Sequence, residues 1–568
     1  MASSHGGPAL ARRGLGGGVA VQETVGEGEV VMKVVRTVAR GASLVLVLAV
    51  LAVAAPAAAP APAHRSAPAL PALLAVQQAE LLADDGTAHD WFGATVAVSG
   101  DTAVVGAPLR TIGGNARQGA VYVFVRAGGV WTQQAELTAL DGAAGDAFGT
   151  AVAVSGGTVV VGAYEHAGRA GAAYVFVRSG ETWTQQAELT GDRVITEEFG
   201  RSVAVSGDTV LVGADDYAAD TMPFTHGAVY VFVRSAGAWT RQTVLMADDP
   251  TLGDAFGYAV ALEGDRALIG AIGHPHDDTG YGPGAAYVFT RSGGAWSQEA
   301  ELAPGDGVRG DGFGGSVALS GGTALVGAAV HAVNGNAVQG AAYVFTRSGA
   351  AWRQQAELVA SDGAFGDSFG ESVALSGDVA LVGAYGFAVN GNSTQGTAYL
   401  FVRSDDAWTQ TEELAADDGA GGDALGRAVA LAGSTALVGA PWHSTGGRIE
   451  QGAAYVFSIG PTASPDLGAP VCPKRAKHGA AFAVSGSLAP RFPAGSKTVT
   501  VTAFRFVKGA WRPLRSYAAV NADAGAASRY SVRVTLKTPG RYRFRASTAA
   551  TAEWLAATSA WSRTLSVK

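Results

Sequence analysis

The sequence has 568 residues but a single cysteine, Cys472, and only 15% of its residues are charged. One cysteine excludes an internal disulfide and a thiolate metal cluster. Lysine is absent from residues 76–460, which carry 17 arginines and 42 acidic residues for a net charge of −25. Because a body of this charge repels nucleic acid, we expect no nucleic-acid partner.

Long apolar runs are also scarce. The run Leu44–Ala55 covers 12 residues, whereas a membrane-spanning helix needs about 20. It follows the basic residues Lys33, Arg36 and Arg40 and precedes a series of small residues, which is the pattern of a secretory signal peptide. The amino-terminal regions are then an unstructured or mis-assigned start (1–31), a signal peptide (32–63) and a linker (64–75). We expect a secreted or cell-surface protein with no membrane span after signal cleavage; a signal retained as an anchor is the alternative.

Glycine and apolar residues are abundant, with 80 glycines and 48% hydrophobic residues. This apolar content is too high for a disordered chain, and the glycines lack the three-residue period of collagen. Glycine-rich turns between apolar strands are the remaining interpretation.

A unit of four motifs repeats through residues 76–460, with successive copies 51 to 57 residues apart. Each copy contains Phe-Gly or Leu-Gly, then Gly-Ala, then Gly-x-x-Tyr-x-Phe, and six copies close with a tryptophan. The first residue of the first motif is Phe92, Phe148, Phe199, Phe256, Phe313, Phe369 or Leu425. Self-similarity at a fixed period is the signature of a repeat architecture.

Each copy predicts four short strands. In the fifth copy these are Ser316–Leu319, Ala324–Val326, Ala341–Thr346 and Trp352–Leu358, and Ser320–Thr323 forms a tight turn between the first two. Seven copies of four antiparallel strands predict an all-β fold, a seven-bladed β-propeller over residues 76–460.

The ends of this region are offset by one strand. The seventh copy stops after Phe457, before its outer strand, and the matching segment Gln77–Leu81 precedes the first copy instead. The amino-terminal strand is therefore predicted to complete the last blade and close the ring, which leaves no free sheet edge.

These motifs resemble a known family. Phe-Gly followed by Gly-Ala-Pro, which is intact at Gly106–Pro108 and Gly439–Pro441, is similar to the FG-GAP repeat of integrin α-chain heads. The fuller pattern, with Ser-Gly-Asp-Thr, Tyr-Val-Phe and a tryptophan strand, is closer to the secreted bacterial variant of this repeat. The resemblance implies a propeller, and related propellers bind proteins, glycans or no known ligand.

One feature departs from the integrin-type repeat, which often carries an Asp-x-Asp-x-Asp-Gly calcium loop between its first two strands. Here that loop is reduced to Ser99-Gly100-Asp101 or a similar turn. One carboxylate cannot supply the roughly 6–8 oxygens that calcium prefers. We therefore expect no family-type calcium site, and no other metal or cofactor.

Acidic residues also occur seven and two positions before the first motif of every copy. A feature of all seven copies is typical of a structural role, here acceptance of backbone N–H groups in glycine-rich turns. Attraction of cations or of a basic partner is the alternative. The pairs are Asp85/Asp90, Asp141/Asp146, Asp192/Glu197, Asp249/Asp254, Asp306/Asp311, Asp362/Asp367 and Asp418/Asp423.

The loops between the second and third strands differ from copy to copy, as a recognition surface requires. They share a face with the acidic loops, because alternate connections in a blade emerge on the same side. Exposed Trp442 and Tyr217 could stack on sugars or anchor a protein, or pack against a neighbouring loop. The histidines and acids of 274–278 could ligate a divalent ion, although a solvated loop is favoured. The candidate ligand-binding residues are Asp215, Asp216, Tyr217, His274, His276, Asp277, Asp278, Trp442 and His443.

A second domain of opposite charge follows a proline-rich linker at 461–470. Residues 461–568 carry 17 basic and 3 acidic residues, a net charge of +14. Alternating segments such as Lys497–Phe506 and Gly540–Ala546 predict a small β-sandwich over 471–568. This domain is similar to the Ig-like modules of bacterial surface proteins.

Arg541, Arg543 and Arg545 recur with period two in this domain and are expected to share one face. Two roles remain open for its charge: binding of an anionic cell-wall polymer, and docking on the acidic propeller. For the whole chain we expect noncatalytic binding or adhesion, with a protein or glycan on one propeller face. An extracellular hydrolase or lyase with a face-centred site and a structural spacer are the alternatives.

Overall fold

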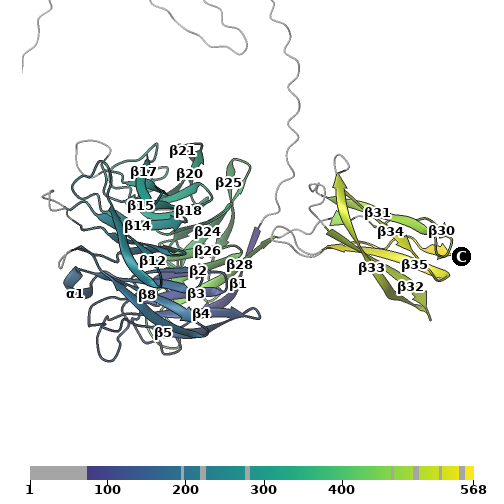
Figure 1. Ribbon diagram of the computed structural model, residues 1–568, viewed down its shortest axis with the longest axis horizontal. Coiled ribbons are helices and arrows are strands. Elements are labelled where there is room, and N and C mark those ends of the chain that lie inside the picture. The colour runs from purple at the N-terminus through teal and green to yellow at the C-terminus, as the bar shows by residue number, and fades with distance from the viewer. Residues whose placement is uncertain are drawn as a thin grey trace, which may run out of the picture. The chain divides into compact units, whose positions relative to one another are not determined.

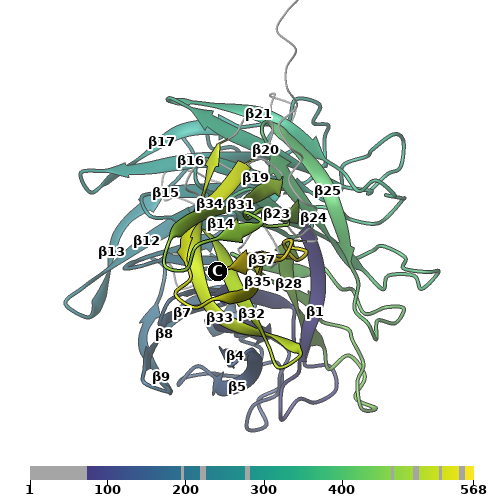
Figure 2. The same cartoon turned by 90° about the vertical axis from the view of Figure 1, so that its right-hand side faces the viewer.

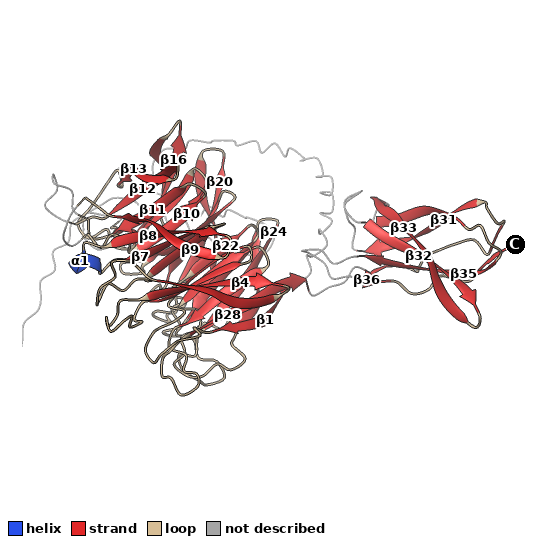
Figure 3. Ribbon diagram, turned by 60° about the horizontal axis from the view of Figure 1, so that its bottom comes forward, coloured by secondary structure: helices blue, strands red, loops and turns tan. Residues whose placement is uncertain are grey.

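The computed structural model describes residues 73–192, 197–217, 225–275, 282–461, 466–467, 469–489, 498–523, 528–548 and 557–568. Strands dominate these residues, and helix in them is confined to one short turn, α1 (His166–Arg169) (Figure 3). Within the described ranges, no helix has the length and apolar character needed to cross a bilayer. The expected start, the signal peptide and residues 64–72 of the linker lie outside the described residues.

Seven antiparallel sheets of four strands form the propeller, and in Figure 2 the colour advances blade by blade around the ring. Blades 1 to 3 are β2 (Thr95–Ser99), β3 (Thr102–Ala107), β4 (Ala120–Ala127), β5 (Val130–Leu137); β6 (Ala151–Ser155), β7 (Thr158–Ala163), β8 (Ala172–Ser179), β9 (Thr182–Leu189); and β10 (Ser202–Ser206), β11 (Thr209–Ala214), β12 (Ala228–Ser235), β13 (Ala238–Leu245).

The remaining blades follow the same order. Blades 4 to 6 are β14 (Phe256–Glu263), β15 (Arg266–Ala271), β16 (Ala285–Ser292), β17 (Ala295–Leu302); β18 (Phe313–Ser320), β19 (Thr323–Ala328), β20 (Ala341–Ser348), β21 (Ala351–Leu358); and β22 (Val373–Ser376), β23 (Val379–Ala384), β24 (Thr397–Ser404), β25 (Ala407–Leu414). Blade 7 consists of β26 (Ala428–Ala432), β27 (Thr435–Ala440), β28 (Ala453–Pro461) and β1 (Leu73–Leu81). The predicted fold is confirmed.

The two middle strands of each blade are apolar on both faces. All six residues of β19 are buried, as are the first five of β20. Neighbouring blades cover both faces of these strands, which is why their sequences do not alternate. The outer strands alternate between exposed and half-buried residues, because one face is in contact with solvent.

An aromatic cluster repeats in the core of the blades. In blade 5 the ring of Phe313 lies 5.6 Å from the ring of Tyr343 and 6.0 Å from that of Phe345, both edge-on. All three side chains are buried. Edge-on pairs of this kind contribute about 0.5–1.5 kcal/mol each beyond the burial of their area.

Glycines of the repeat motifs allow neighbouring blades to approach backbone to backbone. A Cβ added to Gly327 of β19 would overlap the carbonyl oxygen of Gly370, the Phe-Gly glycine of the next blade. Gly439 of blade 7 lies in the same way against Gly93 of blade 1. Contacts between blades therefore require the glycines of the Gly-Ala and Phe-Gly motifs, and this includes the contact that closes the ring.

The predicted closure by the amino-terminal strand is confirmed. β1 pairs antiparallel with β28, with Leu81 opposite Ala454, and the two strands lie side by side in Figures 1 and 2. The side chain of Leu81 is buried in the contact with blade 1. Gln77 of β1 accepts a hydrogen bond from the backbone N–H of Asp417 at 3.0 Å. Glutamines of other outer strands make the equivalent bond: Gln133, Gln185, Gln298, Gln354 and Gln410.

In four of the seven blades, the turn between the first two strands carries an aspartate that is already paired. Asp101 accepts from the guanidinium of Arg126 at 2.7 Å, and that guanidinium stacks on Trp131. The same pairing joins Asp208 to Arg234, Asp265 to Arg291 and Asp378 to Arg403. The aspartate that an integrin-type loop would offer to calcium is thus neutralised by an arginine of the third strand.

The carboxy-terminal residues form a separate two-layered β unit. Its first layer pairs β29 (Asp466–Leu467), β31 (Ala481–Ala489), β34 (Ser528–Thr535) and the end of β33 (Ala510–Asp523). Its second layer pairs the start of β33 with β32 (Thr498–Val507), β35 (Gly540–Thr548), β36 (Ala557–Thr558), β37 (Leu565–Val567) and β30 (Arg475–Ala476). One apolar core with members from both layers holds them together. Kinship to Ig-like modules stays a prediction.

Deleting residues 64–82 is expected to open the ring and lower the melting temperature. The deletion removes the β1–β28 ladder and buried Leu81, and one large apolar side chain contributes about 1.5–3 kcal/mol. The free edge of β28 should also promote association, which size-exclusion chromatography detects. Deletion of 64–70 is the control, with no expected change. An unchanged, monomeric melting transition after the longer deletion would contradict the closure.

Calcium is not expected to stabilise the propeller through the hairpin turns. Four of the seven turns offer an aspartate, and in each of them an arginine partner competes with any ion. Millimolar calcium added to chelator-treated protein should leave the melting temperature unchanged. A rise of more than about 5 °C, equivalent to more than about 1 kcal/mol of binding, that Asp101→Ala diminished would contradict this interpretation.

Candidate functional site

A cavity of about 690 Å³ lies where the inner strands of the seven blades meet. Its wall includes one valine from the same repeat position of each inner strand: Val96, Val152, Val203, Val260, Val317, Val373 and Val429. A cavity of this size is within the range that binds small ligands. The apolar wall is thus built from repeated residues.

The remaining lining residues differ from blade to blade. The residue that follows the Phe-Gly or Leu-Gly motif lines the cavity in every blade, as Ala94, Thr150, Arg201, Tyr258, Gly315, Glu371 and Arg427. These positions place polar, charged and aromatic groups at fixed angles around one axis, because each belongs to the start of an inner strand. The sevenfold framework therefore presents an asymmetric set of side chains.

Three aromatic side chains form an arc on one side of the cavity. Trp442 is in edge-on contact with Trp91, with ring centres 6.2 Å apart, and with Tyr385, with ring centres 6.4 Å apart. Trp91 Nε1 donates to Glu450 at 3.3 Å, which fixes that indole. All three rings are half-buried. Such rings offer apolar faces to a ligand while their polar edges remain hydrogen-bonded.

Charged side chains line the cavity next to the three aromatic rings. Arg427 forms an ion pair with Glu371, and its guanidinium lies 5.5 Å from the ring of Tyr385. Burial raises the pKa of Glu371, and the nearby guanidiniums of Arg427 and Arg201 oppose that shift. The carboxylate is thus held in a partly dehydrated place where a hydrogen bond to a ligand is strengthened.

A second arginine lies between two tyrosines. The Arg201 guanidinium is 5.4 Å from the ring of Tyr164 and 4.7 Å from that of Tyr258. Its Nε lies 3.7 Å from Asp215 Oδ2, and burial raises the pKa of Asp215 while Arg201 opposes the shift. The cavity therefore combines aromatic faces with two arginines that are oriented by stacking and by carboxylates.

The structure brings two of the predicted site residues to this cavity. Trp442 lines it, and Asp215 lies behind Arg201. Asp216 is half-buried beside Asp215. Tyr217 is also half-buried, edge-on to His226 at 5.9 Å and to Tyr230 at 6.2 Å, so it packs within its own blade. His276, Asp277 and Asp278 lie outside the described residues.

The expectation that His274 and His443 are exposed loop residues is wrong. Their side chains are only 5% and 6% exposed. The loop after the second strand turns back at this position, so that His443 lies edge-on to Tyr455 at 6.0 Å and His274 to Tyr287 at 5.8 Å. The residue at this position differs between blades because different side chains fill the same buried pocket. A variable loop is therefore not by itself evidence of an exposed surface.

Sequence reasoning missed Arg201, Tyr258, Glu371 and Arg427. A signal for them exists, because the residue after each Phe-Gly or Leu-Gly pair varies while the pair itself recurs. Variation at one position inside a repeated motif indicates a side chain that the framework does not need. A comparison of the copies, position by position, therefore marks these residues as candidates for a role outside packing.

Comparison with known proteins agrees with the repeat pattern. Seven segments match the FG-GAP repeat family: 75–124, 131–176, 183–232, 239–289, 296–345, 352–401 and 408–457. Each segment from the second onward runs from the outer strand of one blade to the third strand of the next, and the first begins in β1.

Among solved structures, the chain is similar to the extracellular region of plexin A4. The identity is 7%, the alignment covers 86% of this chain and 67% of that one, and the TM-score is 0.35. A search of curated proteins gives no match. Because the seven matching segments make up more than half of its residues, the chain belongs to the FG-GAP repeat family.

Proposed function

We propose that this chain is an exported binding protein that holds a glycan at the central cavity of its propeller without turning it over. The observation that supports it is the asymmetric wall, where Trp91, Trp442 and Tyr385 adjoin the Arg427–Glu371 pair. The framework positions are committed to packing, so ligand contacts belong to the residues in which the blades differ.

The chemistry of the wall favours a sugar. Aromatic rings pack on the apolar faces of pyranose rings, and charged side chains bind the hydroxyl groups at their edges. Two arginines and one lining glutamate supply such hydrogen bonds next to the aromatic arc. A protein ligand would have to insert a side chain or terminus into the same cavity, and this is the alternative that the binding test separates.

A noncatalytic role is supported by the acid content of the cavity. Among the described residues that line it, Glu371 is the single carboxylate. Glycoside hydrolysis by the usual route requires two carboxyl groups about 5–9.5 Å apart. A hydrolase or lyase that uses other residues, and a structural spacer, are the competing functions. The predicted signal peptide supports export.

The carboxy-terminal unit supports a second contact, with an anionic cell-wall polymer. Arg541, Arg543 and Arg545 alternate with buried residues of β35 and stack at 5.0, 4.9 and 4.9 Å on aromatic rings of the same layer. The rings are Phe506, Trp511 and Trp561. Stacking holds the guanidiniums in a row at little entropic cost, which suits repeated anionic groups. This contact would tether the propeller at the cell surface.

Trp442→Ala is expected to weaken glycan binding by about 1–4 kcal/mol, or about 5- to 1000-fold in Kd. The substitution removes the central ring of the aromatic arc. The binding glycan is first identified on an array with the full chain, and affinity is then measured by calorimetry. Arg427→Ala is a second variant with an exposed side chain, and Asp378→Ala in a hairpin turn is the control.

Three outcomes would contradict the proposed function. Loss of binding in Asp378→Ala but not in Trp442→Ala would place the ligand elsewhere. Saturable binding on a protein array with none on the glycan array would favour a protein ligand. Product formation from the bound glycan, measured by chromatography, would make the chain an enzyme.

Replacing Arg541 and Arg545 by glutamine is expected to reduce binding to a polyphosphate-type wall polymer at least about tenfold. Two stacked charges are lost, and the salt dependence of the affinity should become shallower with them. Arg529→Gln with Arg533→Gln on β34, in the other layer, changes the net charge equally and is the matched control. Equal losses in both double variants would show that net charge alone accounts for binding.

A further inference from the structure

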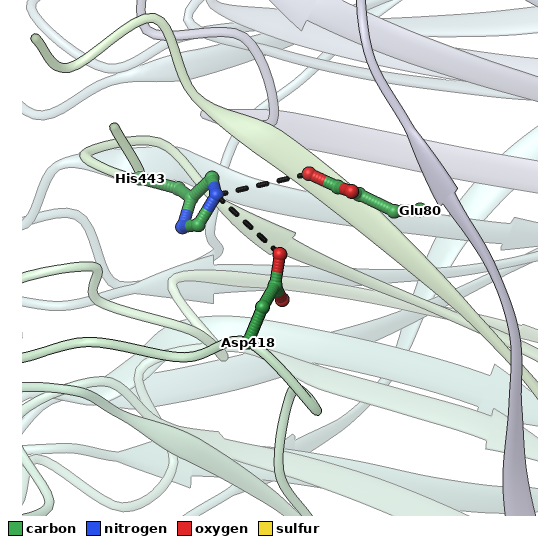
Figure 4. A group of neighbouring side chains, drawn as sticks. All are labelled: Glu80, Asp418 and His443. Atoms are coloured by element: carbon green, nitrogen blue, oxygen red, sulfur yellow. Dashed lines mark ion pairs between the residues drawn. The ribbon is translucent and has the colours of Figure 1, made fainter. Parts of the chain in front are cut away.

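The buried histidine of blade 7 lies between two carboxylates. Its Nε2 is 3.7 Å from Glu80 Oε1 and 3.8 Å from Asp418 Oδ2 (Figure 4). Glu80 belongs to β1, Asp418 to the loop between β25 and β26, and His443 to the loop after β27. Three segments far apart in the chain thus direct one nitrogen and two oxygens at a common point.

Two of these groups, His443 and Asp418, are held in place by further hydrogen bonds. Asp423 Oδ2 lies 2.9 Å from His443 Nδ1 and also accepts the backbone N–H of Ala420 at 2.7 Å. Tyr455 Oη donates to Asp418 Oδ1 at 2.9 Å, which leaves Oδ2 directed at the histidine. When Nδ1 donates to Asp423, Nε2 presents its lone pair to the pocket. A carboxylate behind a histidine is the arrangement that orients metal-ligating imidazoles.

The glutamate oxygen that faces His443 is an unsatisfied acceptor. Oε1 of Glu80 is buried and has no hydrogen-bond partner in the described part of the chain. The distances from His443 Nε2 to both carboxylates exceed hydrogen-bond length. Burial raises the pKa of Glu80, and Asp418 adds to the shift by repulsion. A cation bound between the two carboxylates would satisfy both.

Three further blades repeat the pocket. In each, one atom from a histidine, an aspartate and a glutamate lie within 4.8 Å of one another. The groups are Asp141/His166/Glu188 in blade 2, Asp249/His274/Glu301 in blade 4 and Asp306/His331/Glu357 in blade 5. Nδ1 of His166 and of His331 is 2.9 Å from an aspartate, as in blade 7. The arrangement is therefore a repeated part of the fold.

The blades without this histidine provide an internal comparison. Blade 1 has Arg110 in its place, and the guanidinium binds Asp85 at 2.5 Å and Asp90 at 2.9 Å. The corresponding carboxylates thus accept a cation that the chain itself supplies. Blade 3 has Tyr217 instead, and Val244 replaces the glutamate. Blade 6 has Phe387, so a phenyl ring also fits this position.

We propose that the four His–Asp–Glu pockets are binding sites for a divalent metal ion of the zinc class. Zinc bonds of about 2.0–2.2 Å to nitrogen and oxygen place neighbouring tetrahedral ligands about 3.4 Å apart. In blade 7 the two distances from His443 Nε2 exceed that spacing by only a few tenths of an ångström, and all three ligand atoms lie within 4.8 Å of one another. The imidazole ligand disfavours calcium and magnesium, which prefer all-oxygen sites. With three protein ligands, the fourth position is open to water.

The blade 7 site would join the two ends of the propeller. Glu80 lies on the amino-terminal strand, whereas Asp418 and His443 belong to the last repeat. A metal ion held by all three would fasten β1 to the blade it completes, in addition to the β1–β28 ladder. Binding to the folded ring alone would stabilise it by mass action.

Zinc binding to the full chain, treated with chelator and dialysed, tests the proposal. Isothermal titration is expected to give about four sites per chain, and zinc at about 100 times its Kd should raise the melting temperature by about 5 °C or more. Cobalt is the spectroscopic probe, because a tetrahedral site with a histidine ligand gives visible d–d absorption. Calcium at the same concentration should produce neither effect. Absence of zinc binding, or zinc binding without cobalt absorption, would overturn the proposal.

Variants of blade 7 assign the sites to the pockets. His443→Phe copies the residue that blade 6 carries at this position, so the fold should be retained while the stoichiometry falls from about four to about three. Glu80→Gln should weaken the same site. Glu413→Gln in blade 6, where the histidine is missing, is the matched control and should keep four sites. Unchanged stoichiometry in His443→Phe would overturn the assignment.

Melting measurements on metal-free protein separate a metal site from a plain ion pair. If His443 served only as an imidazolium between the acids, His443→Phe would lower the melting temperature without metal and zinc would not bind. That result would overturn the proposal.

Discussion

The close approach of neighbouring blades at paired glycines is the constraint on which the rest of the structure depends. At every junction, the glycine of one second strand lies against the carbonyl of the next Phe-Gly or Leu-Gly glycine, where a Cβ would overlap the backbone. The contact between Gly439 and Gly93 shows that the seventh junction is like the others. This spacing lets seven sheets cover both faces of one another and bury the aromatic clusters between them.

The fold could be predicted from the sequence because the residues that impose it recur. Phe-Gly, Gly-Ala and Tyr-x-Phe serve contacts that are identical in each blade, so any side chain at these positions must satisfy the same neighbours. The closing strand was predictable for the same reason, since Gln77–Leu81 has the sequence of an outer strand and a place before the first copy. The residues that recur in every copy are thus the ones that pack the blades together.

The cavity was harder to predict, because its residues come together only when the ring closes. Arg201 and Asp215 lie near each other in sequence, but Trp91 meets Trp442 across the junction of the first and last blades. The burial of the histidines is hard to predict for a related reason. A variable loop position suggests an exposed residue, but this loop folds back and places the side chain against the tyrosine of the third strand. Variation between copies identifies positions that the packing of the blades does not constrain. It does not by itself show whether such a position lies on the surface or in a buried pocket.

The acidic pairs show how one repeated feature serves two purposes. The second acid of the pair accepts a backbone N–H within its own loop, as Asp311 does from Val308 at 2.7 Å and Asp423 from Ala420 at 2.7 Å. This is the structural role that the sequence predicts. The first acid accepts the hydroxyl of a core tyrosine, as Asp306 does from Tyr343 at 3.0 Å. Its other oxygen faces one variable position in the loop after the second strand, which is His331 in this blade.

The side chain that faces this remaining oxygen decides how the charge of the first acid is balanced. Where the residue at this loop position is Arg110, its guanidinium balances the charge of the two acids within the chain. Where it is a histidine, a metal ion at the proposed site would balance the charge, and both the burial of Glu80 and its repulsion from Asp418 favour such a balance. The net charge of −25 over residues 76–460 is therefore partly a property of the junctions between blades. The residue at one loop position decides whether the acidic charge at a junction is balanced by the chain itself or requires a bound cation.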